Sequence, residues 1–263
     1  MMTLPVAGLA GARLAGYDRW GLLAAANAGT PFVYLPAYGG LLAGIIGGRK
    51  ALTALAASVA VAHVAWTAPE LRGRRRPPSS GVSNRPRLRV LTANLRYGNP
   101  DVTAIGTEIA DSGADIVLLQ ELVGDHLTAL KAAGAFDRYS FSLADPRRDS
   151  FGGGIWSRYP LSEGDIWEVD DHPTVRATAD VEGTQVRLYN LHAKAPSTTR
   201  WIGLWKTQLR LLGDDLARDP RPAIMAGDYN ATFGHKPFRD LLARGLSEAH
   251  MEAGRGMAAT WPQ

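Results

Sequence analysis

Apolar and polar positions divide the chain into two parts that meet near residue 70. Before that point lie two long apolar stretches, 31–48 and 51–68, separated only by Arg49 and Lys50. Each is close to the ~17 to 25 residues that a helix needs to cross a bilayer. Both are apolar on nearly all sides, whereas a helix of a soluble domain carries a polar stripe. The pattern therefore predicts a membrane hairpin within residues 1–70.

Single residues in this part fit the hairpin. Tyr34 and Tyr38 near one end and Trp66 near another suit anchoring at the membrane interface, and His63 is expected to be a tolerated polar residue at a packed interface. The small residues that suit close helix packing are Gly39, Gly40, Gly44 and Gly47. A signal peptide fits less well, because its single apolar region is only about 7 to 15 residues long. A buried helix pair in a soluble domain is the other alternative.

Lys and Arg residues give conflicting signals for membrane orientation. Arg49 and Lys50 place the short loop on the cytoplasmic side, whereas the heavier cluster Arg72–Arg76 argues the opposite. We expect a membrane location, in particular the plasma membrane, with the side of the following domain open. Residues 1–28 carry a weaker apolar signal and predict a further helix or an interfacial segment.

An Arg-, Pro- and Ser-rich run at 71–86 predicts a linker, followed by a second domain at 87–263. From Arg87 onward, short strand-like runs alternate with helical stretches. The predicted strands are 87–95, 114–120, 153–157, 174–181, 185–191 and 223–226. The predicted helices are 101–112, 125–133, 198–218 and 236–244. This alternation predicts an α/β or α+β domain with at least one large sheet.

Composition narrows the chemistry. The chain of 263 residues is 46% apolar and 21% charged, which is ordinary for a folded protein and excludes disorder throughout. It has no cysteine, so disulfides, thiolate zinc sites and cysteine nucleophiles are excluded. The net charge of +4 comes largely from Arg between residues 72 and 89, so it is a local cluster and does not indicate a nucleic-acid-binding domain.

Polar residues stand where apolar strand-like runs end: Asn94, Glu121, His192, Asp228 and Asn230. A rigid scaffold presents reactive groups at such positions. Glu121 directly follows the apolar run 116–119 and Gln120. A carboxylate at such a position is costly to bury unless it is paired or binds a metal. Together these residues indicate one site.

Five segments carry a resemblance to a known family: Leu91-Thr-Ala-Asn-Leu, Val117-Leu-Leu-Gln-Glu, Gly153-Gly-Ile-Trp-Ser-Arg-Tyr-Pro-Leu, Tyr189-Asn-Leu-His and Ile224-Met-Ala-Gly-Asp-Tyr-Asn. In order and context they resemble the endonuclease/exonuclease/phosphatase family, over about residues 88–261. The resemblance implies a DNase I-like four-layer α/β/β/α sandwich with the active site at one edge.

The resemblance also implies roles for the site residues. Glu121, with Asn94 beside it, is expected to bind Mg²⁺, or Mn²⁺ in its place, because hard cations prefer oxygen ligands. Asp228 would orient or deprotonate the attacking water, and His192 would bind phosphate or transfer a proton. Asn230 would donate a hydrogen bond to a phosphoryl oxygen or hold the nucleophile. Gly227 would permit the turn that presents Asp228.

Arg158 is expected either to contact phosphate or to brace the site through an ion pair.

The C-terminus departs from the family pattern. That pattern continues past a Thr-Trp segment to one more strand carrying an Asp-His pair, whereas this sequence stops at Thr260-Trp-Pro-Gln263. His235 and His250 do not lie in the expected setting and are predicted to be surface or loop residues. The expectation is a fragment of a longer protein, or a truncated protein with impaired activity.

Two functions remain open. One is a membrane-tethered, metal-dependent hydrolase of a phosphoester substrate: a nucleic acid, a phospholipid or a small phosphodiester. The other is a catalytically impaired, membrane-anchored domain that binds a phosphorylated ligand or a partner; no specific protein partner is implied. Substrate choice lies in loops that these motifs do not describe.

Overall fold

The computed structural model describes residues 2–16, 18, 20–72, 87–169, 172–256, 258 and 260. Nearly all of the predicted linker at 71–86, and the segment 261–263, lie outside the described residues. The chain divides into two compact units. One contains the N-terminal helices, Ala195–Asp214 and the chain from Ala231 onward. The other contains all eight described strands, with Asp215–Asn230.

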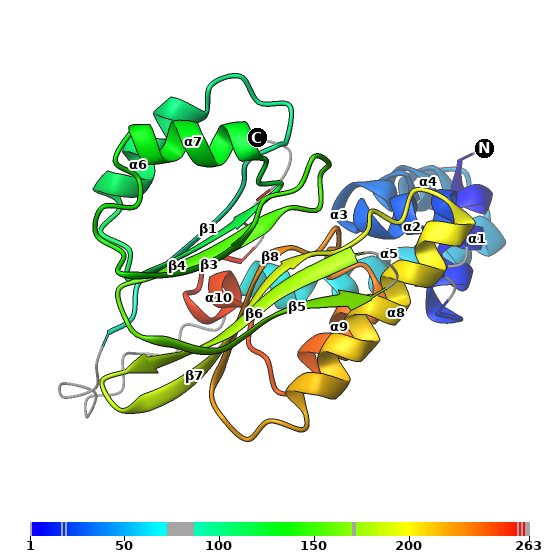
Figure 1. Ribbon diagram of the computed structural model, residues 1–263. Coiled ribbons are helices and arrows are strands. Elements are labelled where there is room, and N and C mark those ends of the chain that lie inside the picture. Colours follow the sequence, from blue (N-terminus) through cyan, green and yellow to red (C-terminus); the bar gives the residue numbers. More distant parts are fainter. Residues whose placement is uncertain are drawn as a thin grey trace. The chain divides into compact units, whose positions relative to one another are not determined.

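The strand-containing unit is built on two four-stranded sheets (Figure 1). The first has the order β1-β2-β4-β3, formed by Val90–Asn94, Ile116–Gln120, Gly153–Ser157 and Phe141–Asp145. The second has the order β5-β6-β7-β8, formed by Leu161–Val169, His172–Val181, Thr184–His192 and Ala223–Asp228. Strands β1 and β2 are parallel, as are β7 and β8, and the other neighbours are antiparallel.

Two apolar cores hold these layers together. Ile116, Leu118 and Ile155 of the first sheet share a buried cluster with Val175 and Leu188 of the second. On the other face of the first sheet, α6 (Val102–Asp111) and α7 (Gly124–Ala132) cover a second cluster (Figure 1). Strand β2 is buried on both faces, as its unbroken apolar run predicts. The predicted α/β fold with two packed sheets is confirmed.

The six predicted strands are observed, and two further strands were not predicted. These are β3 and β5, which lie at the edges of their sheets. Edge strands face water along much of their length, so they carry polar residues instead of an alternating apolar pattern. Strand β5 includes Glu163, Asp165 and Glu168, and β3 is largely exposed. The predicted helices are observed as α6, α7, α8 (Thr199–Leu216) and α9 (Lys236–Leu242), followed by a short α10 (Ala249–Glu252).

Five helices form the N-terminal region: α1 (Thr3–Leu14), α2 (Gly21–Ala28), α3 (Thr30–Val33), α4 (Pro36–Ile46) and α5 (Lys50–Arg72). The predicted span 51–68 lies within α5, whose residues Lys50–Leu71 are long and apolar enough to cross a bilayer. The predicted span 31–48 is divided between α3 and α4, each of which has a proline in its first turn. Helices Gly21–Ala28 and Thr30–Ile46, taken together, are also long and apolar enough to cross a bilayer, but they are bent by 85° relative to each other.

Small residues bring these helices close together at two of the four predicted glycines. A Cβ on Gly44 would lie 2.6 Å from Thr53 Oγ1, and one on Gly40 would lie 2.1 Å from Thr3 Oγ1. Tyr34 is fully buried against Val59 and Trp66, so its prediction as an interfacial anchor is wrong. Its ring is needed in the helical core.

His63 is buried, as predicted, and its Nδ1 lies 3.1 Å from the Tyr38 hydroxyl.

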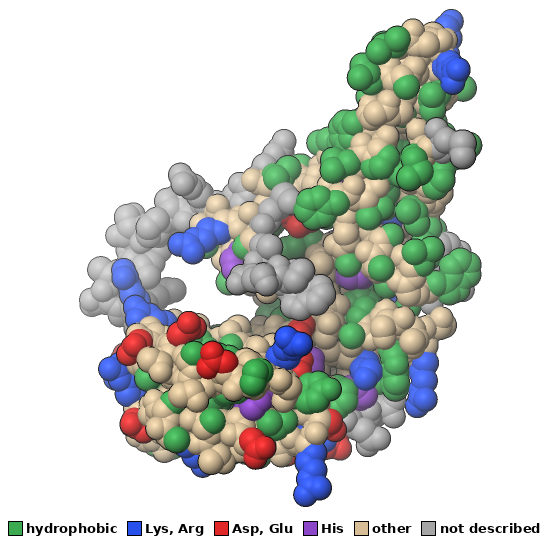
Figure 2. Space-filling view, turned by 90° about the horizontal axis from the view of Figure 1, so that it is seen from above, with side chains coloured by type: hydrophobic (Ala, Val, Ile, Leu, Met, Phe, Trp, Pro, Cys, Tyr) green, Lys and Arg blue, Asp and Glu red, His purple; other side chains and the backbone are tan. Residues whose placement is uncertain are grey.

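Helices α4 and α5 expose large apolar side chains. Ile46 is 78% exposed and Val61 is 70% exposed, and Leu42, Ile45 and Val64 are also more than half exposed. Figure 2 shows hydrophobic side chains gathered over the N-terminal helices. Proteins in water rarely keep contiguous apolar surface of this kind unless it contacts a partner or a membrane.

Candidate active site

Four of the predicted site residues lie at the same ends of paired strands. Asn94 ends β1 and pairs in register with Gln120, after which Glu121 leaves β2. His192 ends β7 and pairs in register with Asp228, which ends β8. Because each pair of strands is parallel, both members of a pair end at one edge of the sheet.

The side-chain amide of Asn94 connects two carboxylates. Its Nδ2 donates to Glu121 Oε1 at 2.8 Å and to Asp228 Oδ2 at 3.0 Å. Its Oδ1 accepts from the Arg96 backbone N–H at 2.8 Å, which fixes the orientation of the amide. The Tyr97 backbone N–H donates to Glu121 Oε2 at 2.9 Å. Neutral donors therefore hold both carboxylates in one place.

His192 faces the same two carboxylates. Its Nδ1 lies 2.8 Å from the Ser150 carbonyl oxygen, so Nδ1 carries a hydrogen and donates it. The neutral ring then has its lone pair on Nε2, which lies 3.8 Å from Glu121 Oε1 and 4.0 Å from Asp228 Oδ2. The loop carbonyl thus sets a tautomer whose proton-accepting nitrogen points into the cluster.

The turn after β8 presents Asp228. Gly227 has φ 136°, and a Cβ there would lie 2.0 Å from the Leu191 carbonyl oxygen, so only glycine fits. The Asn230 N–H donates to Asp228 Oδ1 at 2.9 Å, and Asn230 Nδ2 donates to the Ala193 carbonyl at 2.8 Å. Asn230 therefore braces the turn that carries Asp228.

Glu121 has a left-handed backbone, with φ 55°. This conformation is uncommon for a residue with a side chain, and residues held in it are concentrated at functional sites. The next residue is fixed by backbone bonds: Leu122 N–H donates to the Gly152 carbonyl at 3.0 Å, and Arg147 N–H donates to the Leu122 carbonyl at 3.1 Å. The surroundings therefore impose the sharp turn that brings Glu121 out of β2.

A buried polar pair behind the site was not predicted. Gln120 Nε2 donates to Asn190 Oδ1 at 2.6 Å, which joins the two sheets directly behind Glu121 and His192. Asn190 Nδ2 donates to the carbonyls of Leu119 at 2.8 Å and Gly154 at 3.0 Å. The signal was present, since both residues interrupt buried apolar strands, where a polar group needs partners.

Ser150 was also missed. It contributes a backbone carbonyl, which any residue type can supply.

Arg158 lies away from the cluster. It follows Ser157 at the end of β4 remote from Gly153, and four residues of strand at ~3.3 Å each separate these ends by about 13 Å. Its Nη1 donates to Asp115 Oδ1 at 3.0 Å. The structure thus shows Arg158 in an ion pair and does not bring it to the site.

The two C-terminal histidines have different environments. His250 is partly exposed and contacts Glu248 at 2.8 Å, in keeping with the prediction of a surface residue. His235 lies in the loop before α9, but it is buried, so a surface position is wrong for it. Its partners come from α2 and from its own loop.

The cluster offers oxygen ligands for a hard cation. Mg²⁺ usually takes one or two carboxylates and keeps several waters. The side chains of Glu121 and Asp228 are 16% and 29% exposed, which leaves room for water. Among the described residues, no group of three His, Asp or Glu side chains is close enough to hold a metal by itself. Asn94 turns its N–H groups, rather than its oxygen, toward the carboxylates, so Glu121 is the better candidate ligand.

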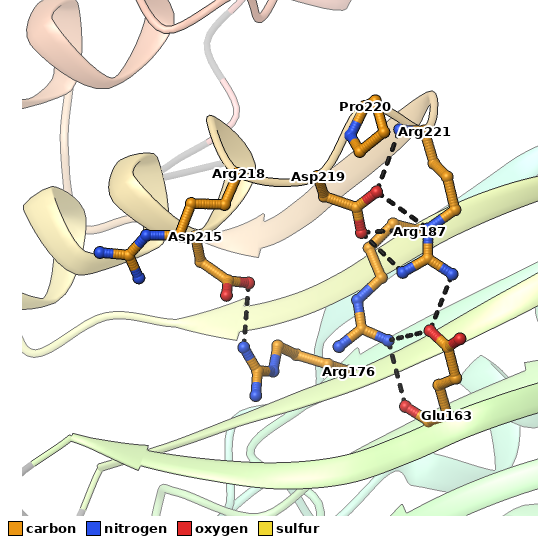
Figure 3. Close-up of a pocket in the computed structure, with 8 residues that line it drawn as sticks. All are labelled: Glu163, Arg176, Arg187, Asp215, Arg218, Asp219, Pro220 and Arg221. Atoms are coloured by element: carbon orange, nitrogen blue, oxygen red, sulfur yellow. Dashed lines mark hydrogen bonds and ion pairs between the residues drawn. The ribbon is translucent and has the colours of Figure 1, made fainter.

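A pocket of about 490 Å³ lies at the other end of the second sheet (Figure 3). It is lined by Arg176, Arg187, Arg218, Arg221, Glu163, Asp215, Asp219 and Pro220. Arg221 pairs with Asp219 and with Glu163, both at 2.7 Å, and Arg176 pairs with Asp215 at 2.9 Å. The hydrogen bond from Arg221 lowers the pKa of Asp219 to about 2. These mutual pairs give the pocket a structural role.

Solved structures similar to parts of this chain were found. A structure of humanized D. rerio TDP2 matches with 20% identity and a TM-score of 0.50, over 59% of this chain and 66% of that one. Sphingomyelinase C from Streptomyces griseocarneus matches with 24% identity and a TM-score of 0.48, over 61% and 70%. The chain spans 48 to 66% of the TDP2 structures it matches. The comparison with curated proteins found no match.

The model of the Endonuclease/Exonuclease/phosphatase family matches residues 91–263, which is more than half of the chain and includes every residue of the cluster. The match begins in β1, three residues before Asn94, and contains β2, β7 and β8 with their terminal side chains. The protein belongs to the Endonuclease/Exonuclease/phosphatase family.

Proposed function

We propose that the protein is a divalent-metal-dependent hydrolase of phosphoester bonds whose active site is the cluster of Asn94, Glu121, His192 and Asp228. One observation carries this proposal: the Asn94 amide joins the Glu121 and Asp228 carboxylates, with His192 Nε2 within 4.0 Å of both. Family membership supports the same chemistry.

Each side chain has a role that its contacts permit. Glu121 would hold Mg²⁺ or Mn²⁺, which when bound would stabilise charge on the phosphoryl and leaving oxygens. Asp228 would orient and deprotonate the attacking water, with Asn230 bracing its carboxylate. His192 Nε2 would accept a proton or, once protonated, donate to a phosphoryl oxygen. Asn94 would keep the two carboxylates apart and aligned.

The N-terminal helices would attach this enzyme to a membrane. The exposed side chains of Ile46, Val61 and their neighbours on α4 and α5 support this, together with the length of α5. Burial of such side chains in hydrocarbon is favourable by about 25 cal/mol per Å². The substrate would be a phospholipid, a nucleic acid or a small phosphodiester reached from the plasma membrane.

The test is hydrolysis of bis-p-nitrophenyl phosphate by the full-length chain in detergent micelles, with Mg²⁺, with Mn²⁺ and with EDTA. We expect turnover with either metal, none with EDTA, and loss of turnover in Asp228→Ala and Glu121→Gln. Arg158→Ala is the matched control, because Arg158 lies at the far end of β4 and should leave turnover unchanged. Folded wild-type protein without turnover in either metal would contradict the proposal and favour a binding role.

Membrane attachment is tested by flotation of the full chain with phosphatidylcholine vesicles. We expect the wild-type protein to float with the vesicles after washing at high salt. Recovery of folded, unaggregated protein in the soluble fraction without detergent would contradict membrane attachment.

A further inference from the structure

A pocket of about 370 Å³ lies beside Glu121, within the strand-containing unit. Tyr97 lines this pocket, and its backbone N–H donates to Glu121 Oε2 at 2.9 Å. Val123, which follows Glu121 by two residues, lines the pocket as well. A group bound here would therefore lie next to a phosphoester held at Glu121.

His126 brings an unmet hydrogen bond to this pocket. It lies in the first turn of α7 and is 6% exposed, yet its buried Nδ1 has no hydrogen-bond partner among the described residues. Nearly all buried polar groups in folded proteins have a partner, so this exception needs an explanation. His126 lines the pocket, and the soft torsion about its Cβ–Cγ bond lets the ring turn a nitrogen toward a ligand. A hydroxyl group would suit either ring tautomer, because it both donates and accepts.

Other polar residues add donors and acceptors to the same pocket: Asn99, Thr103 and Asp125. Asn99 Oδ1 accepts from the Asp101 backbone N–H at 3.0 Å, which leaves the Nδ2 group as a donor. The Asp125 carboxylate supplies acceptors, and the Thr103 hydroxyl supplies both functions. None of the described lining residues is Lys or Arg, so this pocket differs from the arginine-lined one. Its polar groups are suited to a ligand with several hydroxyl groups.

The charges around the pocket favour an uncharged ligand. Thr103 and His126 belong to the first turns of α6 and α7, so the N-termini of both helices lie at the pocket. A helix N-terminus acts as roughly half a positive charge, and the two together offset about the single negative charge of Asp125. Asp125 would repel an anionic group, and the helix N-termini would repel a cationic head group. A neutral hydroxylated group meets neither penalty.

We infer that this pocket binds an uncharged ring with several hydroxyl groups, a sugar or a cyclitol, which the substrate carries beside its phosphoester bond. The inference rests on the proposed function and makes His126 a specificity-determining residue. The volume is near the lower end of the roughly 300 to 1,000 Å³ of ligand pockets, which suits one ring better than a long chain. Tyr97 is 55% exposed and offers an aromatic face to the apolar side of such a ring.

The test is isothermal titration calorimetry of the full-length chain in micelles with Mg²⁺. The probes are phosphate monoesters: myo-inositol phosphate and glucose phosphate carry hydroxylated rings, cyclohexyl phosphate carries a ring without hydroxyls, and phosphocholine carries a cation. We expect one of the hydroxylated probes to bind about tenfold more tightly than the last two, because a site built for hydroxyl groups discriminates against ligands that lack them. The tighter of the two distinguishes a cyclitol from a sugar. Similar affinities for all probes, or no binding of either hydroxylated ring, would overturn the inference.

His126→Phe tests the specificity-determining residue. It keeps a ring and removes both nitrogens. We expect the affinity for the preferred hydroxylated probe to fall about tenfold and the affinity for cyclohexyl phosphate to stay within about twofold. Equal changes for the two probes would overturn the assignment of His126.

Thr103 offers a milder pair if His126→Phe does not fold. Thr103 is exposed, so its substitution disturbs no core. Thr103→Val removes the hydroxyl and Thr103→Ser keeps it. We expect the first to weaken binding of the hydroxylated probe about threefold and the second to leave it unchanged. Thr107→Val is the matched control, one turn further along α6 and outside the described pocket lining; equal effects at the two threonines would overturn the inference.

Calorimetry does not depend on turnover, so the two proposals fail separately. Selective binding without hydrolysis of bis-p-nitrophenyl phosphate would contradict the proposed function alone. Hydrolysis without selective binding would overturn this inference alone.

Discussion

The two ends of the second sheet carry charged side chains in opposite ways. At one end, Glu163 and Asp219 are neutralised by Arg221 within hydrogen-bonding distance. At the other end, the described hydrogen bonds to Glu121 and Asp228 come from the Asn94 amide and from backbone N–H groups. A pocket of about 490 Å³ is at the first end, and the candidate active site is at the second.

This difference shows why a pocket alone does not identify a candidate active site. A carboxylate paired with a guanidinium has little remaining attraction for a cation, whereas one held by neutral donors keeps its charge. Neutral donors also fix the position of a carboxylate without removing its ability to act as a base or a ligand.

The largest effect is expected at Gly227. Gly227→Ala would place a methyl group against the Leu191 carbonyl and strain a backbone at φ 136°, so we expect a loss of about 3 kcal/mol in the free energy of unfolding. Urea denaturation measures this loss. Gly183→Ala is the control, because Gly183 also has positive φ but no atom within 4 Å of a Cβ; about 1 kcal/mol is expected there. Equal losses would show that the close approach at Gly227 is unimportant.

The next effect concerns turnover alone. His192→Gln removes the Nε2 lone pair that faces the two carboxylates, and loss of a proton-transfer group typically lowers turnover by about 10²-fold or more. Steady-state kinetics with bis-p-nitrophenyl phosphate measures it. The corresponding change at the other end of the sheet, Arg221→Gln, should leave turnover within about twofold. A similar fall in both variants would contradict the contrast between the ends.

A smaller effect is expected on stability at the arginine-lined end. Arg221→Ala removes the pairs to Asp219 and Glu163, and because these groups are largely solvated we expect only a small lowering of the thermal midpoint. Thermal unfolding at pH 7 and low salt measures it. Added salt should reduce the difference between variant and wild type, because it screens the exposed pairs.

The smallest effect concerns acid. The pKa of Asp219 is about 2 in the folded protein and 3.8 in its ordinary state, so ionised Asp219 favours the folded state. Its contribution is complete above about pH 4 and is lost as the pH falls through 2. Unfolding measured across this range should show a smaller decline in Arg221→Ala than in the wild-type protein. Parallel declines would mean that the Arg221 hydrogen bond does not cause the shift.

Much of the site was predictable because it depends on local pattern. Asn94, Glu121, His192 and Asp228 each end an apolar strand, and strand ends can be read from the order of residues. The hydrogen bond between Gln120 and Asn190 was not predictable. The residue pattern of a single strand does not indicate which strand of the other sheet packs against it. For the same reason, the apolar and polar pattern of neither segment predicts the hydrogen bond between His235 and the Ala24 carbonyl.

The family motif left two roles open for Arg158, a phosphate contact or an ion pair. Strand β4 runs antiparallel to β2, which carries Arg158 to the end away from the cluster, where it pairs with Asp115. Strand direction is a property of the sheet and not of the motif.

The bond between His235 and Ala24 joins residues 211 positions apart, which has a consequence for synthesis of the chain. At roughly 5 to 20 residues per second, the ribosome needs on the order of 10 to 40 s to make the residues between them. Helices α1 and α2 are therefore synthesised first, before His235, which donates to the Ala24 carbonyl, has been made. His235 can donate to the Ala24 carbonyl only after residue 235 has been synthesised, so the N-terminal helices complete their contacts only once this much later part of the chain has been made.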